Sequence, residues 1–538
     1  MHRRRFLQST LLTGIASVVE PSLARADSER TTDRIAAFEF EETTIEGLQS
    51  RMRSGELGAR KIAEKYLERI STVDKHGPSI NSVIELNPDA VAIADELDKE
   101  RKVKGPRGPM HGIPVLIKDN IDTADRMATT AGSMAMIGSK PPKDAFIVQR
   151  LREAGAVILG KTNLSEWANI RSSHSTSGWS GRGGLTRNPY ALDRNPCGSS
   201  SGSGAAVSAN LCAVAIGTET DGSIVCPSSA NGIVGIKPTV GLASRTGIIP
   251  ISHSQDTPGP MARTVQDAAI LLSAIAGVDP DDVATSSSRG RSQPDYTKFL
   301  DPNGLRGARL GIVQKYFGFS ENVDALMNSV IDAMKRAGST ILDPVDLPTF
   351  GKFDDTELTV LEYELKADLN AYLARLAPGA PVRTLKDVIE FNERNHDREL
   401  KYFGQDIFLK AQEKGALTET EYIDALAKNR QLSRAEGIDA VMDRLQLDAL
   451  VAPTGSPAWT TDLVNGDHSV GGSSNFAAVA GYPNINVPAG MIFGLPVGIS
   501  FFGRAWSEPT LIKIAYAFEQ LVKARSAPKF LPTANLES

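Results

Sequence analysis

An unusual run of small residues, CGSSSGSG, occupies positions 197–204 of the chain. Four serines and three glycines within these positions could form a flexible linker, a phosphate-binding loop or a loop that holds a nucleophile. A linker is disfavoured, because the run leads directly into the apolar sequence AAVSANLCAVAIG, which predicts a buried helix and then a strand. A phosphate-binding loop is disfavoured too, because the sequence lacks G-x-x-x-x-G-K-[ST] and has no G-x-G-x-x-G after a strand.

The same run satisfies the G-x-S-x-G pattern of serine hydrolases at Gly198–Gly202. That pattern normally follows a strand, whereas the residues DRNPC before it predict a turn. A Ser-His-Asp triad also needs a histidine, and His253, His396 and His468 lie in no recognisable context. A hydrolase with that triad is therefore disfavoured.

Two further segments belong with the serine run. Lys118 ends the apolar stretch IPVLIK, and Ser223 lies within TETDGSIVCP, 24 residues after Ser199. Cleavage of an amide needs a nucleophile, a way to protonate the departing nitrogen and donors for the developing oxyanion. The three segments in this order and spacing resemble the amidase signature family. Burial at the end of an apolar strand would lower the pKa of Lys118, as the role of base that the resemblance implies requires.

That resemblance implies hydrolysis of a carboxamide C–N bond through an acyl-enzyme, with release of ammonia. It makes Ser223 the nucleophile, Ser199 the bridging serine and Lys118 the base, and it places Ser199 on a cis peptide bond. Ser200, Ser201 and Ser203 are then expected to be structural and to support the loop by hydrogen bonds.

The resemblance also implies an oxyanion hole made of backbone N–H groups just before and at the nucleophile, from Thr220, Asp221, Gly222 and Ser223. Asp221 stands where many members have glycine. Val225 stands where many members have an arginine that meets a substrate carboxylate. Without this arginine, the site lacks this partner for the carboxylate of a free amino acid, which argues against a substrate such as glutamine.

The segments NLSEWAN, SGWSGRGG and ETDGSIVCP resemble the peptide-amidase branch of the family. The substrate is therefore expected to be a small amide, or more specifically the C-terminal amide of a peptide. Glu166 and Arg182, which lie in these segments, either shape the peptide pocket or form a structural ion pair. The alternatives are a fatty or aryl amide hydrolase, the glutamine-hydrolysing component of a tRNA-dependent amidotransferase, and a non-catalytic binding protein that keeps the fold.

Alternating helical and strand-like segments predict an α/β fold, and the resemblance implies a large mixed twisted sheet with helices on both faces, the amidase signature fold. Residues 27–538 are expected to form one amidase domain with a helix-rich insertion near 280–445. Apolar runs predict strands at 113–118, 156–160, 310–313, 339–342, 448–453, 484–488 and 495–502. Apolar periodicity and capping residues predict helices at 59–75, 88–100, 144–154, 323–337 and 508–524.

Residues 1–26 resemble a signal peptide of the twin-arginine type, with consecutive arginines, a short apolar stretch and an Ala24-Arg25-Ala26 cleavage site. Export to the periplasm or outside the cell is expected. Beyond residue 26 no run of 18 apolar residues predicts a membrane anchor.

The remaining composition narrows the class of partner. The net charge is −5 with no long block of like charge, so no nucleic-acid-binding arm is expected. Cys197, Cys212 and Cys226 lack zinc-site spacing and are predicted to be packed thiols. No metal and no cofactor are predicted, and the choice between a monomer and a homo-oligomer stays open.

Overall fold

The computed structural model describes residues 37–537, and the chain from Ala37 onward forms one compact unit. The predicted signal peptide, residues 1–26, lies outside the described residues. None of the helices in the described part has the length and apolarity that crossing a membrane requires.

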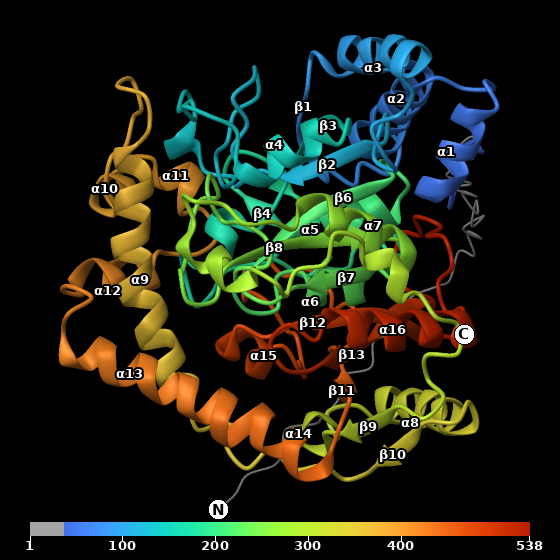
Figure 1. Cartoon of the computed structure of the whole chain (residues 1–538). Coiled ribbons are helices and arrows are strands. Elements are labelled where there is room, and N and C mark those ends of the chain that lie inside the picture. The colour runs from blue at the N-terminus through green and yellow to red at the C-terminus, as the bar shows by residue number, and fades with distance from the viewer. Residues whose placement is uncertain (1–36, 538) are drawn as a thin grey trace, which may run out of the picture. The chain divides into compact units, whose positions relative to one another are not determined.

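An eleven-stranded mixed sheet forms the core (Figure 1). Parallel pairs such as β2 with β3 and with β6 combine with antiparallel pairs such as β6 with β8. The strand order is β1 (Val83–Leu86), β3 (Val157–Thr162), β2 (Pro114–Lys118), β6 (Val214–Glu219), β8 (Thr257–Ala262), β7 (Val234–Lys237), β12 (Asn484–Ile492), β13 (Leu495–Phe502), β11 (Ala449–Pro453), β9 (Arg309–Ile312) and β10 (Thr340–Leu342). The predicted α/β fold with a large mixed sheet is confirmed.

The middle strands of the first half are buried along their whole length. Every residue of β2, β3 and β6 is buried. Continuous apolar runs of this kind are typical of strands covered on both faces, and they are the runs from which the sequence predicted strands. They also carry Lys118 to the interior of the sheet.

The helices that pack on the sheet form two groups, and the members of each group contact one another. In one group, α5 (Ser201–Ser208) packs against α6 (Val225–Ala230); these helices follow the two predicted catalytic serines. In the other group, α7 (Val265–Ile275) packs against α4 (Phe146–Glu153) and α16 (Glu508–Val522), and α16 packs against α8 (Glu321–Arg336). At the ends of the sheet lie α2 (Ala59–Arg69) and α3 (Ala90–Lys104) beside β3, and α8 beside β9 and β10 (Figure 1). Helix α1 (Ile45–Arg53) begins against α7, where the N–H of Ile45 donates to Asp267.

A further layer of helices lies along one side of the sheet, gold to orange in Figure 1. The longest of them, α9, buries Leu365, Leu369 and Tyr372 in a cluster that also contains Trp167 and Ile249 from the first half of the chain. This packing brings α9 next to the loop after β7. The helices of this layer are α9 (Asp354–Ala374), α10 (Leu385–Arg394), α11 (His396–Glu399), α12 (Asp406–Glu413), α13 (Thr420–Arg430) and α14 (Asp439–Leu445).

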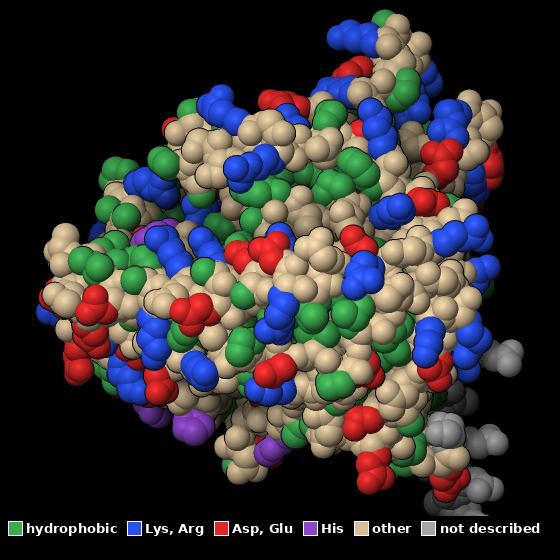
Figure 2. Space-filling view, turned by 60° about the horizontal axis from the view of Figure 1, so that its bottom comes forward, with side chains coloured by type: hydrophobic (Ala, Val, Ile, Leu, Met, Phe, Trp, Pro, Cys, Tyr) green, Lys and Arg blue, Asp and Glu red, His purple; other side chains and the backbone are tan. Residues whose placement is uncertain are grey.

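Basic and acidic side chains are interspersed on the face of the molecule in Figure 2, and that face carries no continuous basic surface. Nucleic-acid-binding proteins gather Lys and Arg on one face. This face therefore lacks the cluster of basic side chains that is typical of a nucleic-acid-binding surface.

The glycines of the serine run permit close contact between α5 and the neighbouring backbone. A Cβ at Gly202 would overlap the carbonyl oxygens of Ser82 and Asn163, which are backbone atoms that cannot rotate away. At Gly204 a Cβ would lie 3.1 Å from the carbonyl oxygen of Pro227 and 3.0 Å from the side chain of Asn231, so only a small shift is needed. Gly202 is thus the position at which the backbones meet most closely.

Gly202→Ala is expected to lower the free energy of unfolding by about 1–3 kcal/mol, because the added methyl group pushes α5 off the sheet. Urea unfolding followed by circular dichroism measures this loss. Gly204→Ala is the matched control and should cost clearly less. Equal losses for the two variants would contradict the close approach at Gly202.

Candidate active site

The side-chain amine of Lys118 lies at the end of β2 and is fully buried. Its Nζ is 2.7 Å from Oγ of Ser199, 2.9 Å from Oγ1 of Thr218 and 3.2 Å from the carbonyl oxygen of Thr218. All three partners are uncharged. Within residues 37–537 no carboxylate pairs with this amine, so burial acts on it without a counter-ion.

Burial lowers the pKa of Lys118 to about 7, against the charges of Asp256 and Glu219, which act in the opposite direction. An amine with this pKa is substantially unprotonated near neutral pH. Its lone pair can then accept the proton of the Ser199 hydroxyl. The arrangement suits a general base.

Ser199 follows a cis peptide bond from Gly198, as the resemblance implied. The residue is fully buried, and its carbonyl oxygen accepts a hydrogen bond from the N–H of Ser165 at 3.1 Å. Its hydroxyl is left to face Lys118. The structure therefore brings two of the three predicted catalytic side chains into direct contact.

The neighbouring serines attach the loop to β6. Ser200 Oγ donates to the carbonyl of Thr218 at 3.1 Å and accepts from the N–H of Thr218 at 3.2 Å. Ser203 Oγ donates to the carbonyl of Ile216 at 3.0 Å. Ser201 Oγ has a longer contact, 3.4 Å, with the hydroxyl of Ser165. These contacts agree with the structural role predicted for the three serines.

Ser223 lies just before α6 and is 8% exposed. Its carbonyl oxygen accepts the N–H of Ser200 at 3.2 Å, which joins the two serine-bearing segments through their backbones. Among the described residues, no hydrogen bond links the hydroxyls of Ser199 and Ser223. The proton path between these two hydroxyls stays a prediction.

A carboxylate holds the backbone that follows the predicted oxyanion donors. Glu219 Oε2 accepts the N–H groups of Ile224 at 2.7 Å and Val225 at 3.0 Å, which fixes the start of α6. Gly222 has a φ of +76°, a conformation that glycine adopts without strain. Burial raises the pKa of the half-buried Asp221 to about 6. The oxyanion role of Thr220, Asp221 and Gly222 stays a prediction.

Asp256 joins this segment to a nearby loop. Its carboxylate accepts the hydroxyl of Thr220 at 2.6 Å and the N–H groups of Ile251 and Ser252 at 2.8 and 2.9 Å. Burial raises the pKa of Asp256 to about 6. No sequence pattern indicated this residue, because only the folded chain brings position 256 to Thr220.

A cavity of about 340 Å³ lies beside these residues. Thr218, which binds the Lys118 amine, and Thr220 form part of its wall. The loop 248–251 (Ile-Ile-Pro-Ile) and Tyr372 of α9 give it an apolar side. The three predicted catalytic side chains are not part of its wall, so the cavity adjoins the site.

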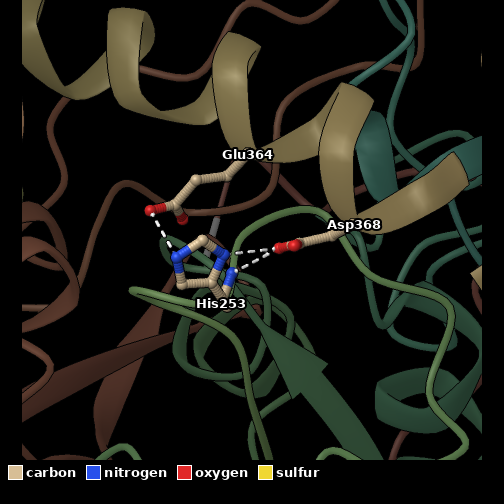
Figure 3. Close-up of side chains that lie close together, drawn as sticks. All are labelled: His253, Glu364 and Asp368. Carbon is tan, nitrogen blue, oxygen red and sulfur yellow. Dashed lines mark hydrogen bonds and ion pairs between the residues drawn. The ribbon is translucent and has the colours of Figure 1, made fainter. Parts of the chain in front are cut away.

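His253 lies at the rim of the cavity between two carboxylates of α9 (Figure 3). Its Nδ1 is 2.8 Å from Asp368 and its Nε2 is 3.2 Å from Glu364. Glu364 also accepts the hydroxyl of Tyr422 at 2.7 Å. Burial lowers the pKa of His253, but the hydrogen bond to Asp368 and the charge of Glu364 outweigh it, and the pKa is raised.

These three side chains are close enough together to be considered as ligands of an ion. However, each ring nitrogen of His253 faces a different carboxylate, whereas a metal ion would use one nitrogen. The geometry fits a protonated imidazole that ties α9 to the loop after β7. The sequence could not indicate this cluster, since His253 and α9 are far apart along the chain.

Glu166 and Arg182 do not pair with each other. Glu166 is buried and lies 3.0 Å from Arg171, and it accepts the N–H of Gly181 at 2.6 Å. Arg182 instead pairs with Glu85 and lies 3.3 Å from Asp119. Of the two alternatives for these residues, the ion pair between them is excluded, because Glu166 pairs with Arg171 and Arg182 pairs with Glu85.

The prediction of three packed thiols was wrong for two of the cysteines. Cys197 and Cys226 form a disulfide with Cα atoms 6.0 Å apart, a separation that disulfides favour. Cys212 is a free, buried thiol. Spacing along the sequence could not reveal the bond, because the fold alone brings the serine run to α6.

A family model described as Amidase matches residues 61–512. The native peptide amidase from Stenotrophomonas maltophilia, a solved structure, is 53% identical, with 92% of this chain and 100% of that chain covered and a TM-score of 0.87. A probable amidase from Arabidopsis thaliana is 45% identical, over 92% of this chain and 93% of its own. One component of the glutamyl-tRNA(Gln) amidotransferase of Microcystis aeruginosa is 34% identical, over 89% of this chain and 97% of its own.

The raised pKa of His253 predicts a pH-dependent contribution to stability. The usual pKa is 6.5, so the stabilisation is fully present below 6.5 and is lost as the pH rises through the higher folded-state pKa. His253→Gln should therefore lower the free energy of unfolding more at about pH 5.5 than at about pH 8.5. Urea unfolding of both proteins at both pH values measures this difference.

Asp368→Asn supplies the control. In a protein that already carries His253→Gln, Asp368→Asn should change the free energy of unfolding equally at the two pH values, because the imidazole that pairs with Asp368 is already gone. An equal loss at both pH values for His253→Gln would contradict a protonated imidazole between Glu364 and Asp368.

Proposed function

The chain belongs to the amidase signature family and is a hydrolase acting on amides, and on this basis we propose that it removes the C-terminal carboxamide of peptides with release of ammonia. Ser223, Ser199 and Lys118 would carry out the reaction. The observation that carries the proposal is the buried contact of 2.7 Å between Lys118 Nζ and Ser199 Oγ, in which the amine has uncharged partners.

The proposed reaction starts with proton transfer. Neutral Lys118 takes the proton of the Ser199 hydroxyl as Ser199 takes that of Ser223, and Ser223 Oγ attacks the amide carbon. The carbonyl oxygen becomes an oxyanion, which the N–H groups of the segment 220–223 would stabilise. The C–N bond then breaks, the relay returns its proton to the nitrogen, and ammonia leaves. Water attacks the resulting ester through the same relay and gives the free acid.

The charge around Ser223 supports an amidated chain end over a free carboxylate. Glu219 and Asp221 belong to the segment that precedes the nucleophile, and Asp256 accepts the hydroxyl of Thr220 in it. Val225 stands at the position of the arginine that could pair with a substrate carboxylate. Carboxylates near one another repel. A C-terminal amide carries no such charge next to the scissile bond.

The cavity beside Thr218 and Thr220 supports an organic residue on the acyl side of the amide. Its apolar wall, the loop 248–251 with Tyr372, could bury a side chain of the last residue of the peptide. The 53% identity to a solved peptide amidase agrees with this assignment.

A second candidate is hydrolysis of glutamine within an amidotransferase, which the 34% identity to a component of such an enzyme favours. The acidic surroundings of Ser223 count against it. Hydrolysis of fatty or aryl amides would use the same residues with another cavity occupant. We further propose that residues 1–26 direct export, and the disulfide supports an oxidising compartment.

Ammonia release by purified residues 27–538 tests the substrate. The panel contains a dipeptide amide, free glutamine, a fatty amide, an aryl amide and a peptide with a free carboxyl end, each with EDTA present. Release from the dipeptide amide alone is expected. Release from glutamine or from a fatty or aryl amide alone would overturn the peptide assignment and leave the three catalytic residues in place.

Ser223→Ala and Lys118→Met should each lower kcat/KM for the dipeptide amide by a factor of about 10⁴, because both substitutions remove a member of one relay. Ser208→Ala is the matched control, since it removes a buried hydroxyl at the far end of α5, and should keep activity. Circular dichroism checks that all variants fold. Full activity of a folded Ser223→Ala protein would overturn the assignment of the nucleophile.

The pKa of Lys118 predicts the acid limb of the pH profile. Because burial lowers this pKa to about 7, the amine becomes protonated and inactive as the pH falls below that value. A plot of log kcat/KM against pH should therefore fall with a slope of about one below pH 7. A profile that stays flat down to about pH 5 would rule out Lys118 as the base.

A further inference from the structure

The disulfide links the two segments that bear the predicted catalytic serines. Cys197 lies two residues before Ser199, and Cys226 lies three residues after Ser223. The bond closes a loop that contains both serines together with α5 and β6. It therefore fixes the position of one serine segment relative to the other by a covalent bond.

Hydrogen bonds join the same segments on either side of the disulfide. At the residue before Cys197, the carbonyl of Pro196 accepts a hydrogen bond from Asn231 Nδ2 at 2.8 Å. Within the loop that the disulfide closes, the N–H of Ser200 donates to the carbonyl of Ser223 at 3.2 Å. These contacts are backbone-to-backbone or come from residues outside the serine pair, and no hydroxyl of the pair takes part in them.

Each half-cystine is itself held in place. The N–H of Cys197 donates to Asn195 Oδ1 at 2.8 Å, and its backbone has a φ of +58°, which residues with side chains seldom adopt. The N–H of Cys226 donates to the carbonyl of Gly222 at 2.8 Å, within the predicted oxyanion segment. Breaking the S–S bond would therefore affect both the segment of Ser199 and the segment of Ser223.

We propose that the Cys197–Cys226 disulfide is a positioning element for the reaction of Ser199 and Ser223, so that the chain is fully active only when these cysteines are oxidised. The inference rests on the proposed function. Reduction by a dithiol such as dithiothreitol transfers two electrons and two protons to the S–S bond, which becomes two thiols, while the dithiol closes to a cyclic disulfide.

One half-cystine of the bond is partly exposed, whereas the third cysteine is fully buried. Cys226 is half-buried and Cys197 is 5% exposed. Cys212 is fully buried, and burial raises the pKa of its thiol to about 12. Since the thiolate is the attacking species in exchange, Cys212 does not rearrange the disulfide.

The experiment measures kcat and KM for the dipeptide amide before and after native reduction with dithiothreitol, with thiols counted by Ellman's reagent. Two new thiols and a drop in kcat of about 10- to 100-fold are expected, with little change in KM, because displacing reacting groups affects chemistry more than binding. Removing the dithiol and reoxidising should restore kcat. The double variant Cys197→Ala/Cys226→Ala should show the low kcat with or without dithiol.

Two controls separate positioning from general loss of stability. Cys212→Ala should remain active when oxidised and keep the full response to dithiol. Met334→Ala, in the buried face of α8 beside β10, lowers stability far from the site and should keep kcat at a temperature where it is folded.

A reduced enzyme with two new thiols and an unchanged kcat would overturn the inference. An equal loss of kcat in Met334→Ala would overturn it as well, because the effect would then follow stability. If the oxidised enzyme fails to release ammonia from every amide in the panel, the proposed function itself fails, which is a different outcome.

Discussion

The burial of one amine without a counter-ion is the constraint on which the rest of the site depends. Lys118 lies at the end of a strand that is covered on both faces, and its partners are hydroxyl and carbonyl oxygens. A carboxylate in contact would hold the proton on the amine and abolish its use as a base. Two acids near the amine, Glu219 and Asp256, accept backbone N–H groups or a hydroxyl instead.

The serine-bearing segments show how such a site is held in its geometry. One segment is anchored to β6 through Ser200 and Ser203, and the other is anchored by Glu219 at the start of α6. Neither anchor uses the hydroxyl of Ser199 or Ser223. The two hydroxyls that we propose to react are thus positioned by groups outside the proposed reaction, which is what preorganisation requires.

The sequence predicted those parts of the fold that local patterns determine. The apolar runs at 113–118 and 495–502 correspond to β2 and β13, because strands covered on both faces are continuously apolar. The order of strands could not be predicted, since nothing local tells β12 to pair with β7. For the same reason the disulfide and the carboxylates around His253 were missed, whereas the contact of Lys118 with Ser199 followed from motifs at a known spacing.

The pairing of β7 with β12 has a consequence for the synthesis of the protein. Six strands of the main sheet, β1, β2, β3, β6, β7 and β8, come from the first half of the chain and are neighbours in the sheet. The outer edge of β7 nevertheless lacks its neighbour until residues 484–492 have been translated. Open strand edges recruit strands of other chains. The edge of β7 that β12 later covers is therefore still unpaired while α9 to α14 are being translated.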